Sequence, residues 1–389
     1  MKSPRQGPPT LTPQRSTKTV KIKNFLARAA AFAAFAISPL VCCTATAQHL
    51  TLEGQTGGFL TPTAYVVYSA KNKVFSHPAV GFHFINTSAV IGNVETFSIT
   101  EGFANRAEIG YTRSVHQFGN QPKTTATPLG LSELWHFNGM NVFHGKVVAI
   151  KEGTGGQWVP GIAVGGVFRT NDRFVSGAIP PLAAANLASM LGPTGAAALT
   201  TQIFGTTKTK SYTNGDVYIA VSKTWAKKPV PFLANVGWKA TNATIFGIGG
   251  QSTRFGGAFF GGLGIPLPLG HGIVAVPSAG FTQEPRTAVN LNKMLNAALY
   301  ACEAASLCNP ANYPLMTAHL PTTLDYAVRV TQRDNPHFSF DIGVGQVAGK
   351  IGSIYVPNPY YPAVGPPVVT TPVNLDARSV VGMGLSYRY

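Results

Sequence analysis

The last nine residues of the chain alternate strictly between apolar side chains and small or polar ones. Val381, Met383, Leu385, Tyr387 and Tyr389 take every second position, and only Gly, Ser or Arg lies between them. Successive side chains of a β-strand point to opposite faces, so these five would share one face. An apolar outside and a polar or small inside are typical of a strand of an outer-membrane β-barrel.

The same two-residue alternation recurs along most of the chain. It is clear in eight further segments and weaker in three: 80–84, 106–115, 161–169, 216–225, 232–239, 255–265, 324–331 and 338–345, then 92–101, 139–151 and 271–283. A tilted strand needs about ten residues to cross a bilayer. We therefore predict an all-β fold, a single antiparallel transmembrane barrel of about twelve strands (ten to fourteen) with short helices in long loops.

The N-terminus has the pattern of a secretory signal. Seven basic residues precede the first acid, Glu53, and an apolar stretch (29–41) is followed by Thr44-Ala45-Thr46-Ala47. This order predicts cleavage after Ala47 and export to the bacterial outer membrane. Seven of the 30 basic residues and none of the 14 acids leave with residues 1–47, so the net charge falls from +16 to +9. No basic run remains, which argues against nucleic-acid binding.

The rest of the chain divides into two predicted parts. Residues 48–76 precede the first clear strand, and their glycines and proline predict turns. This segment either threads into the lumen as a plug or forms a weak first strand. Residues 77–389 would form the barrel. Three insertions interrupt it: 175–207, with a short helix near 184–191; 287–320, with an amphipathic helix; and 353–377, whose six prolines argue against strands.

Charged residues within the predicted strands fall mostly on the polar parity. A charge facing lipid at the bilayer midplane costs ~2–4 kcal/mol, so these side chains are expected to face the lumen. They either line a pore that binds polar solutes or pair across strands as a polar core. The candidates are Arg106, Glu108, Lys146, Asp216, Lys239, Asp325, Arg329 and Asp341.

The sequence carries no recognisable catalytic or metal-binding motif. His-Glu-x-x-His and Gly-x-Ser-x-Gly are absent, and the nine histidines have no ligand-like spacing. We predict no enzymatic activity, no metal and no cofactor. A catalytic serine assembled from separate strands would escape a motif search. Cys302 and Cys308 are the cysteines left after cleavage, and they form either a local disulfide or two reduced thiols.

Several short patches resemble the YjbH-type family of outer-membrane proteins associated with exopolysaccharide production. They are Gly54-Gln55-Thr56-Gly57, Thr61-Pro62-Thr63-Ala64, Lys146 to Glu152, Pro160 with Ala163-Val164-Gly165, and Ser222-Lys223 after Asp216. The resemblance implies a β-barrel linked to envelope polysaccharide, and it supplies no catalytic residue.

These observations predict an integral outer-membrane barrel that acts as a passive conduit or as an assembly factor of the envelope. Expected partners are outer-membrane lipid, the barrel-assembly machinery, and small polar solutes or polysaccharide. Two alternatives stay open: a barrel-borne hydrolase acting on lipid or polysaccharide, and a soluble exported β-sandwich that binds a ligand.

Overall fold

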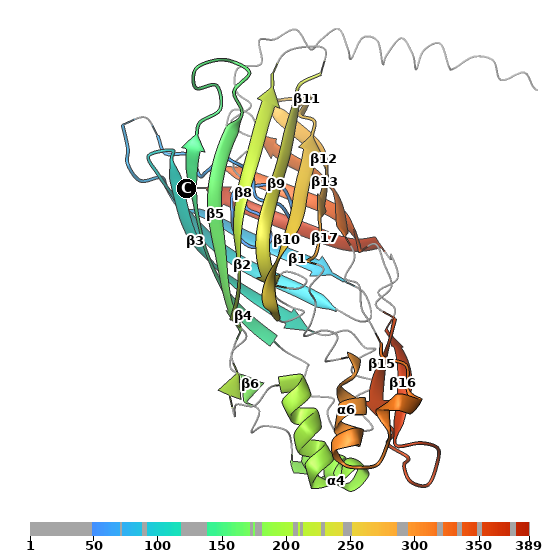
Figure 1. Cartoon of the computed structure of the whole chain (residues 1–389). Helices are drawn as coiled ribbons and strands as arrows, with labels where there is room; N and C mark the ends of the chain where they lie inside the picture. Colours follow the sequence, from blue (N-terminus) through green and yellow to red (C-terminus); the bar gives the residue numbers. More distant parts are fainter. Residues whose placement is uncertain are drawn as a thin grey trace, which may run out of the picture. The chain divides into compact units, whose positions relative to one another are not determined.

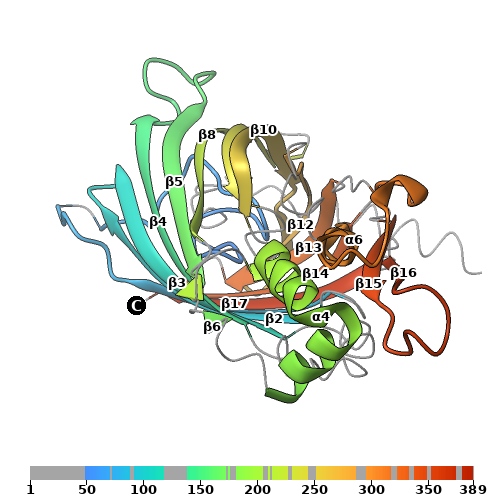
Figure 2. The same cartoon turned by 60° about the horizontal axis from the view of Figure 1, so that its bottom comes forward.

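The strands with alternating side chains form one closed antiparallel sheet (Figures 1 and 2). The computed structural model describes residues 49–70, 72–87, 92–117, 138–171, 174–175, 181–204, 209–210, 213–226, 230–243, 251–285, 295–316, 322–332, 337–347, 352–373 and 379–388. The predicted signal segment and Tyr389 lie outside these residues. No helix within them is long and apolar enough to cross a membrane.

Twelve of the described strands form the ring, each paired with its neighbours in chain order. They are β1 (Ala79–Asn86), β2 (Asn93–Phe103), β3 (Ala107–Gln117), β4 (Asn138–Ile150), β5 (Gly161–Asn171), β8 (Thr213–Trp225), β9 (Phe232–Ala243), β10 (Gln251–Gly264), β12 (Ile273–Thr282), β13 (Thr323–Gln332), β14 (Phe338–Val347) and β17 (Ser379–Arg388).

The ring closes without a free edge. The predicted terminal strand, β17, pairs with β1 on one side and β14 on the other, with Phe82 opposite Leu385. β10 pairs with β12, which completes the ring. The short strand β11 (Leu267–Gly270) also pairs with β12. The predicted twelve-strand barrel is confirmed.

The outward positions of the ring are apolar, as the alternation predicted. Phe97, Ile109, Val217 and Phe259 are each more than half exposed, whereas their strand neighbours are mostly buried. So many exposed large apolar side chains on one surface are typical of a face that meets lipid. In β17, Met383 and Leu385 point outward while Gly384 and Ser386 are buried.

The connections differ systematically between the two ends of the ring. Successive strands of the antiparallel ring run in opposite directions, so connections that follow the first, third, fifth and later odd-numbered ring strands share one end. The four longest connections are of this kind, and their end is here called the long-loop end: 118–137, 172–212, 283–322 and 348–378. The opposite, short-turn end carries the connections 104–106, 151–160, 226–231, 265–272 and 333–337, together with the start of β1 and the end of β17.

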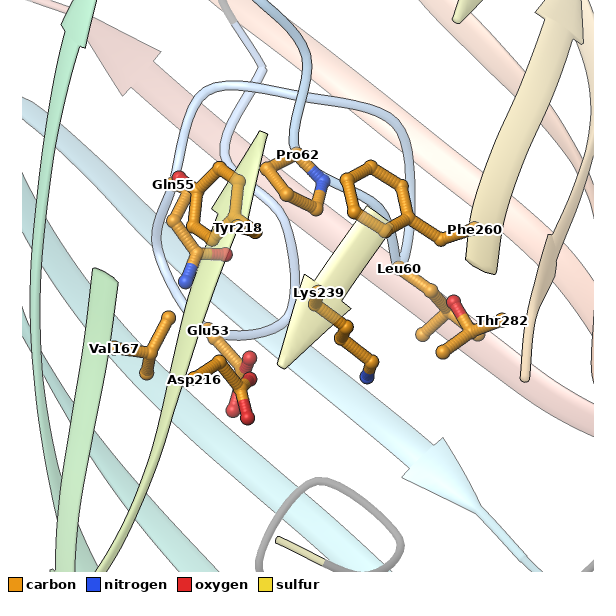
Figure 3. Close-up of a pocket in the computed structure, with 10 residues that line it drawn as sticks. All are labelled: Glu53, Gln55, Leu60, Pro62, Val167, Asp216, Tyr218, Lys239, Phe260 and Thr282. Atoms are coloured by element: carbon orange, nitrogen blue, oxygen red, sulfur yellow. The ribbon is translucent and has the colours of Figure 1, made fainter. Parts of the chain in front are cut away.

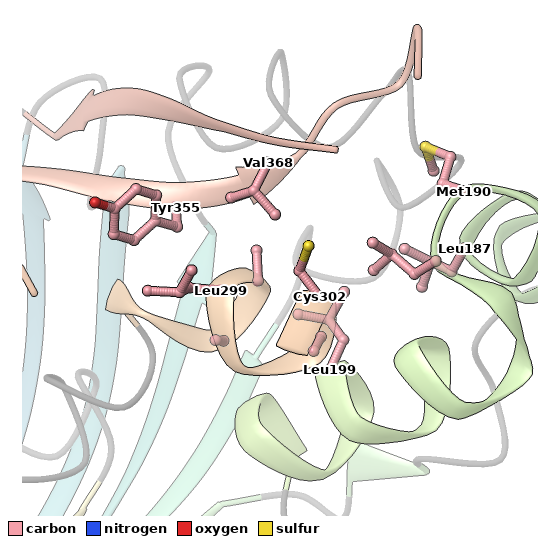
Figure 4. Close-up of a cluster of buried hydrophobic side chains, with 11 residues drawn as sticks. Leu187, Met190, Leu199, Leu299, Cys302, Tyr355 and Val368 are labelled. Atoms are coloured by element: carbon pink, nitrogen blue, oxygen red, sulfur yellow. The ribbon is translucent and has the colours of Figure 1, made fainter. Parts of the chain in front are cut away.

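The long connections contain structure of their own, which packs around a separate apolar cluster (Figure 4). Its elements are α4 (Pro181–Phe204), α6 (Ala297–Ala304), the 3-10 turn η4 (Pro310–Asn312), β15 (Gly352–Pro357) and β16 (Val368–Val373). A further short pair, β6 (Phe174–Val175) with β7 (Thr209–Lys210), joins the two sides of the 172–212 connection. Leu191, Leu299 and Tyr355 are among the buried side chains of this cluster.

Two predictions about these insertions need correction, and one holds over the described residues. The helix predicted near 184–191 extends over α4 and is kinked at Gly192, whose φ is 68°. The predicted amphipathic helix is present as α6, which covers the end of its predicted range; the start of that range lies outside the described residues. The segment 353–377 does contain strands, because Pro357 ends β15 and the other prolines cluster in the turn or near the end of β16.

Candidate functional site: a lumen filled by the N-terminal segment

The segment from His49 to Ser69, here called the plug, lies inside the ring of strands (Figure 3). It forms no strand of the ring, although isolated bridges join Leu50 to Thr56 and Gly57 to Pro62. Most of its residues are buried, and their polar atoms bond to inward-facing side chains all around the wall. Three ionic clusters and a set of close apolar contacts hold the plug in place.

The first cluster joins β3 and β4 to the middle of the plug. Lys146 Nζ lies 3.0 Å from Glu108 Oε1, and both side chains are fully buried. The carboxylate of Glu108 accepts bonds from the backbone N–H groups of Thr56 (2.9 Å) and Val67 (3.1 Å). Lys146 donates to the carbonyl oxygens of Thr56 (2.9 Å) and Thr63 (3.0 Å). The hydroxyl of Thr56 also donates to Glu108 Oε2 at 2.5 Å, so the Glu108–Lys146 pair binds the plug mainly through the plug's backbone groups.

The second cluster centres on Arg169 of β5. Its guanidinium donates to both carboxylate oxygens of Glu53, at 2.5 Å and 2.8 Å, and to Asp216 Oδ2 of β8 at 2.6 Å. The Arg169 side chain is 1% exposed. Two parallel hydrogen bonds between a guanidinium and a carboxylate fix the relative orientation of the two groups and also pair their charges. The turn that carries Glu53 is thus held against β5 and β8.

The third cluster fixes the beginning of the plug. Arg329 Nε of β13 lies 3.0 Å from Asp341 Oδ1 of β14, and Arg329 also donates to the carbonyl of Gly57 (3.2 Å). His49 Nε2 pairs with Asp341, and His49 Nδ1 lies 3.0 Å from Ser339 Oγ. The first described residue is therefore tied to β14.

At the short-turn end the plug leaves the lumen along β8. The backbone N–H of Ala64 donates to Ser222 Oγ at 2.8 Å. Tyr65 donates its hydroxyl to Glu152 Oε2 at 2.5 Å, and Glu152 also pairs with Lys223 at 2.9 Å. These contacts attach the end of the plug to the rim formed by β8 and the β4–β5 turn.

Small residues in the wall make room for the plug. A Cβ at Gly102 would collide with the carbonyl of Val67, and one at Gly382 would lie 2.7 Å from the ring of Phe59. Phe59 also packs with other buried apolar residues of the plug and the wall: Leu52, Leu60, Ile85 and Ala327. The inner wall and the plug are therefore complementary in shape as well as in charge.

Little space remains between the plug and the wall near Arg169. A cavity of about 20 Å³ is lined by residues that include Glu53, Asp216, Tyr218 and Lys239 (Figure 3). A cavity needs roughly 10–15 Å³ to hold one water molecule, so this one has room for water and not for a solute.

The predicted lumen residues fall into several environments. Five of the eight take part in the clusters described above: Glu108, Lys146, Asp216, Arg329 and Asp341. Lys239 is half-buried and lines the cavity. Asp325 is buried, and its Oδ1 has no hydrogen-bond partner among the described residues. Arg106 lies exposed in the turn before β3, not on the inner wall.

Sequence reasoning did not single out Glu53, His49 or Arg169. Arg169 falls on the polar parity of its strand, which is the signal that could have identified it. Glu53 lies outside every strand, and its partner Arg169 is 116 positions away. The structure also pairs Cys302 with Cys308 as a disulfide at the end of α6. No cluster of three metal-ligating side chains occurs in the part of the chain that is described.

Comparison with known proteins does not identify a family for this chain. No family model matches the chain, and no curated protein matches it. Similar solved structures include the KdgM porin, at 7% identity over 80% of this chain and 99% of that one, with a TM-score of 0.35. LpxR from Salmonella typhimurium has 9% identity over 80% and 100%, with a TM-score of 0.41. A Pseudomonas aeruginosa FadL homologue has 8% over 88% and 95%, with a TM-score of 0.34. These values are low, and the assignment of the fold rests on the strand pairing itself.

Proposed function

We propose that this chain is a conduit of the bacterial outer membrane that its own plug closes. The apolar outer face of the ring and the predicted signal segment support this location. In such barrels short turns face the periplasm and long loops face outward. The plug would then enter and leave on the periplasmic side, and the α4–α6 cluster would belong to the external loops.

The observation that carries the proposal is the way the wall charges are paired. Lys146 pairs with Glu108, Arg169 with Asp216, and Arg329 with Asp341, all within the wall. Removing one partner of a buried ion pair costs ~3–5 kcal/mol, because the other charge stays unpaired. Here the plug contributes backbone groups, the hydroxyl of Thr56, the imidazole of His49 and a single carboxylate, that of Glu53. The plug can therefore move out of the lumen while the main cation of each cluster keeps a partner in the wall.

The link to envelope polysaccharide is a further part of the proposal. It is supported by the sequence patches that resemble the YjbH-type family, and those patches lie at contacts between the plug and the wall. Gly54 to Gly57 and Thr61 to Ala64 belong to the plug, and Lys146 and Ser222 bind it. A polar solute or glycan would then be the cargo of the open conduit.

Planar-bilayer recordings test the conduit. The full-length chain is expected to show a closed baseline with brief openings, and deletion of residues 49–69 is expected to give steady conductance. Heat-modifiable migration in detergent gels first establishes that each sample is folded. As a second variant, Ala64→Cys with Ser222→Cys would tether the plug and abolish openings until a reductant is added. A folded full-length barrel that never conducts, beside a deletion variant that does, would contradict a conduit and indicate a permanently filled, structural barrel.

One contact favours a second candidate function, a hydrolase. Ser339 Oγ lies 3.0 Å from His49 Nδ1, and His49 Nε2 pairs with Asp341. A serine, an imidazole and a carboxylate in this order resemble a nucleophilic triad. However, His49 and Asp341 are each 1% exposed, and Asp341 is shared with Arg329, which fits an anchor for the plug better. Labelling by a fluorophosphonate probe that is lost in Ser339→Ala would support the hydrolase; we expect no labelling of the intact chain.

A further inference from the structure

Asp325 differs from every other inward-facing acid on the described strands. Glu108, Asp216 and Asp341 each pair with a base of the wall at 3.0 Å or less. Asp325 has no such partner, and its Oδ1 is buried without a hydrogen bond among the described residues. An unpaired buried carboxylate is costly, so Asp325 does not serve the stability of the barrel.

The wall around Asp325 is built to accommodate this carboxylate. Its neighbours in the register are Gly280 on β12 and Gly345 on β14. A Cβ at Gly280 would collide with the Asp325 carboxylate. A larger side chain at this neighbouring position would displace the acid, whereas glycine leaves room for it on the inner face of the wall.

Asp325 also has a particular place relative to the plug. Two positions further along the same inner face, Ala327 packs against Phe59 and Leu60 of the plug. Asp325 lies on the long-loop side of that contact, because β13 runs from the long-loop end to the short-turn end. Lys239, another inward-facing residue of the described strands, lies on β9 and lines the same cavity as Asp216, three strands away in the ring.

We infer that Asp325 is the specificity-determining residue of the open conduit and favours the passage of cations. This inference rests on the proposed function. When the plug leaves, the charges of the three wall pairs largely cancel, and Asp325 remains as a charge without a counter-ion beside it. Ionisable side chains that face the interior of a membrane protein commonly mark ion pathways.

The test is the reversal potential in a KCl gradient, measured on the variant without residues 49–69. In that background Asp325→Asn is expected to lower the K⁺/Cl⁻ permeability ratio by at least roughly threefold, the effect of a unit charge about 7 Å from a passing ion in water. Asp325→Ser provides a second neutral variant, and Asp325→Glu should keep the original ratio. Glu101→Gln is the matched control, because Glu101 faces outward on β2.

The possible outcomes separate the two proposals. Conductance with an unchanged ratio in both neutral variants would overturn the role of Asp325 and leave the conduit intact. Absence of conductance in every folded variant would overturn both. A second readout, taken on the full-length chain, is the temperature at which the folded gel band is lost, which neutral variants are expected to keep or raise, since they remove an unpaired buried charge. A clear fall in both variants would instead assign Asp325 a structural role and contradict the inference.

Discussion

At the scale of single residues, Arg169 holds the innermost turn of the plug. Its guanidinium bonds to Glu53 of the plug and to Asp216 of the wall, so it joins the two by charge. Alternation within β5 is sufficient to predict that Arg169 faces inward. It does not reveal the partner, because the contact with Glu53 depends on how a strandless segment crosses the lumen.

Replacing Arg169 with Met is expected to release the plug. Glu53 and Asp216 would lose the buried guanidinium that they share, at a cost of about 3–5 kcal/mol, and moving Glu53 into water removes part of that cost. We expect more frequent openings in planar bilayers and a lower temperature for loss of the folded gel band. Arg113→Met is the matched control, because Arg113 lies on the outward parity of β3 and bonds to Asn141. Recordings of Arg169→Met that match the wild type would show that this residue does not hold the plug.

At the scale of elements, strands were predictable and connections were not. A strand's period of two is a local property, and burial on one face is enough to select it. The helix α4 exceeded its predicted length, since it depends on packing against α6 and not on a strong apolar stripe of its own. The hairpin of β15 and β16 was missed because prolines weaken a strand signal even when they stand at its ends.

The disulfide between Cys302 and Cys308 is expected to stabilise only the cluster of α4, α6, β15 and β16. A cross-link between residues six positions apart contributes about 2 kcal/mol in the chain-entropy description. Replacing both cysteines with Ser should speed proteolysis of residues 295–316 and leave heat-modifiable migration unchanged. The same digestion without reductant on the wild type is the control. If the double variant also lost the folded gel band at a lower temperature, the cluster would be coupled to the barrel.

At the scale of the whole molecule, closure of the ring removes every free strand edge. β17 completes the ring by pairing with β1, and β10 completes it by pairing with β12. A spanning sheet needs this closure because lipid offers no hydrogen bonds to unpaired backbone groups. The same closure creates an interior that must be filled, and the plug fills it with polar contacts to the inward charges.

The sequence by itself determined the class of the fold, a strand number of about twelve within a range of ten to fourteen, and which side chains of the strands face lipid. The class and the facing of the side chains follow from an alternation that is complete within about ten residues. Only the tertiary structure decided what the inward charges do, because their partners come from strands and plug residues far apart in the chain. It placed 49–69 inside the lumen, where the sequence left two possibilities, since that choice depends on the shape and charge of a wall that exists only once the ring has closed.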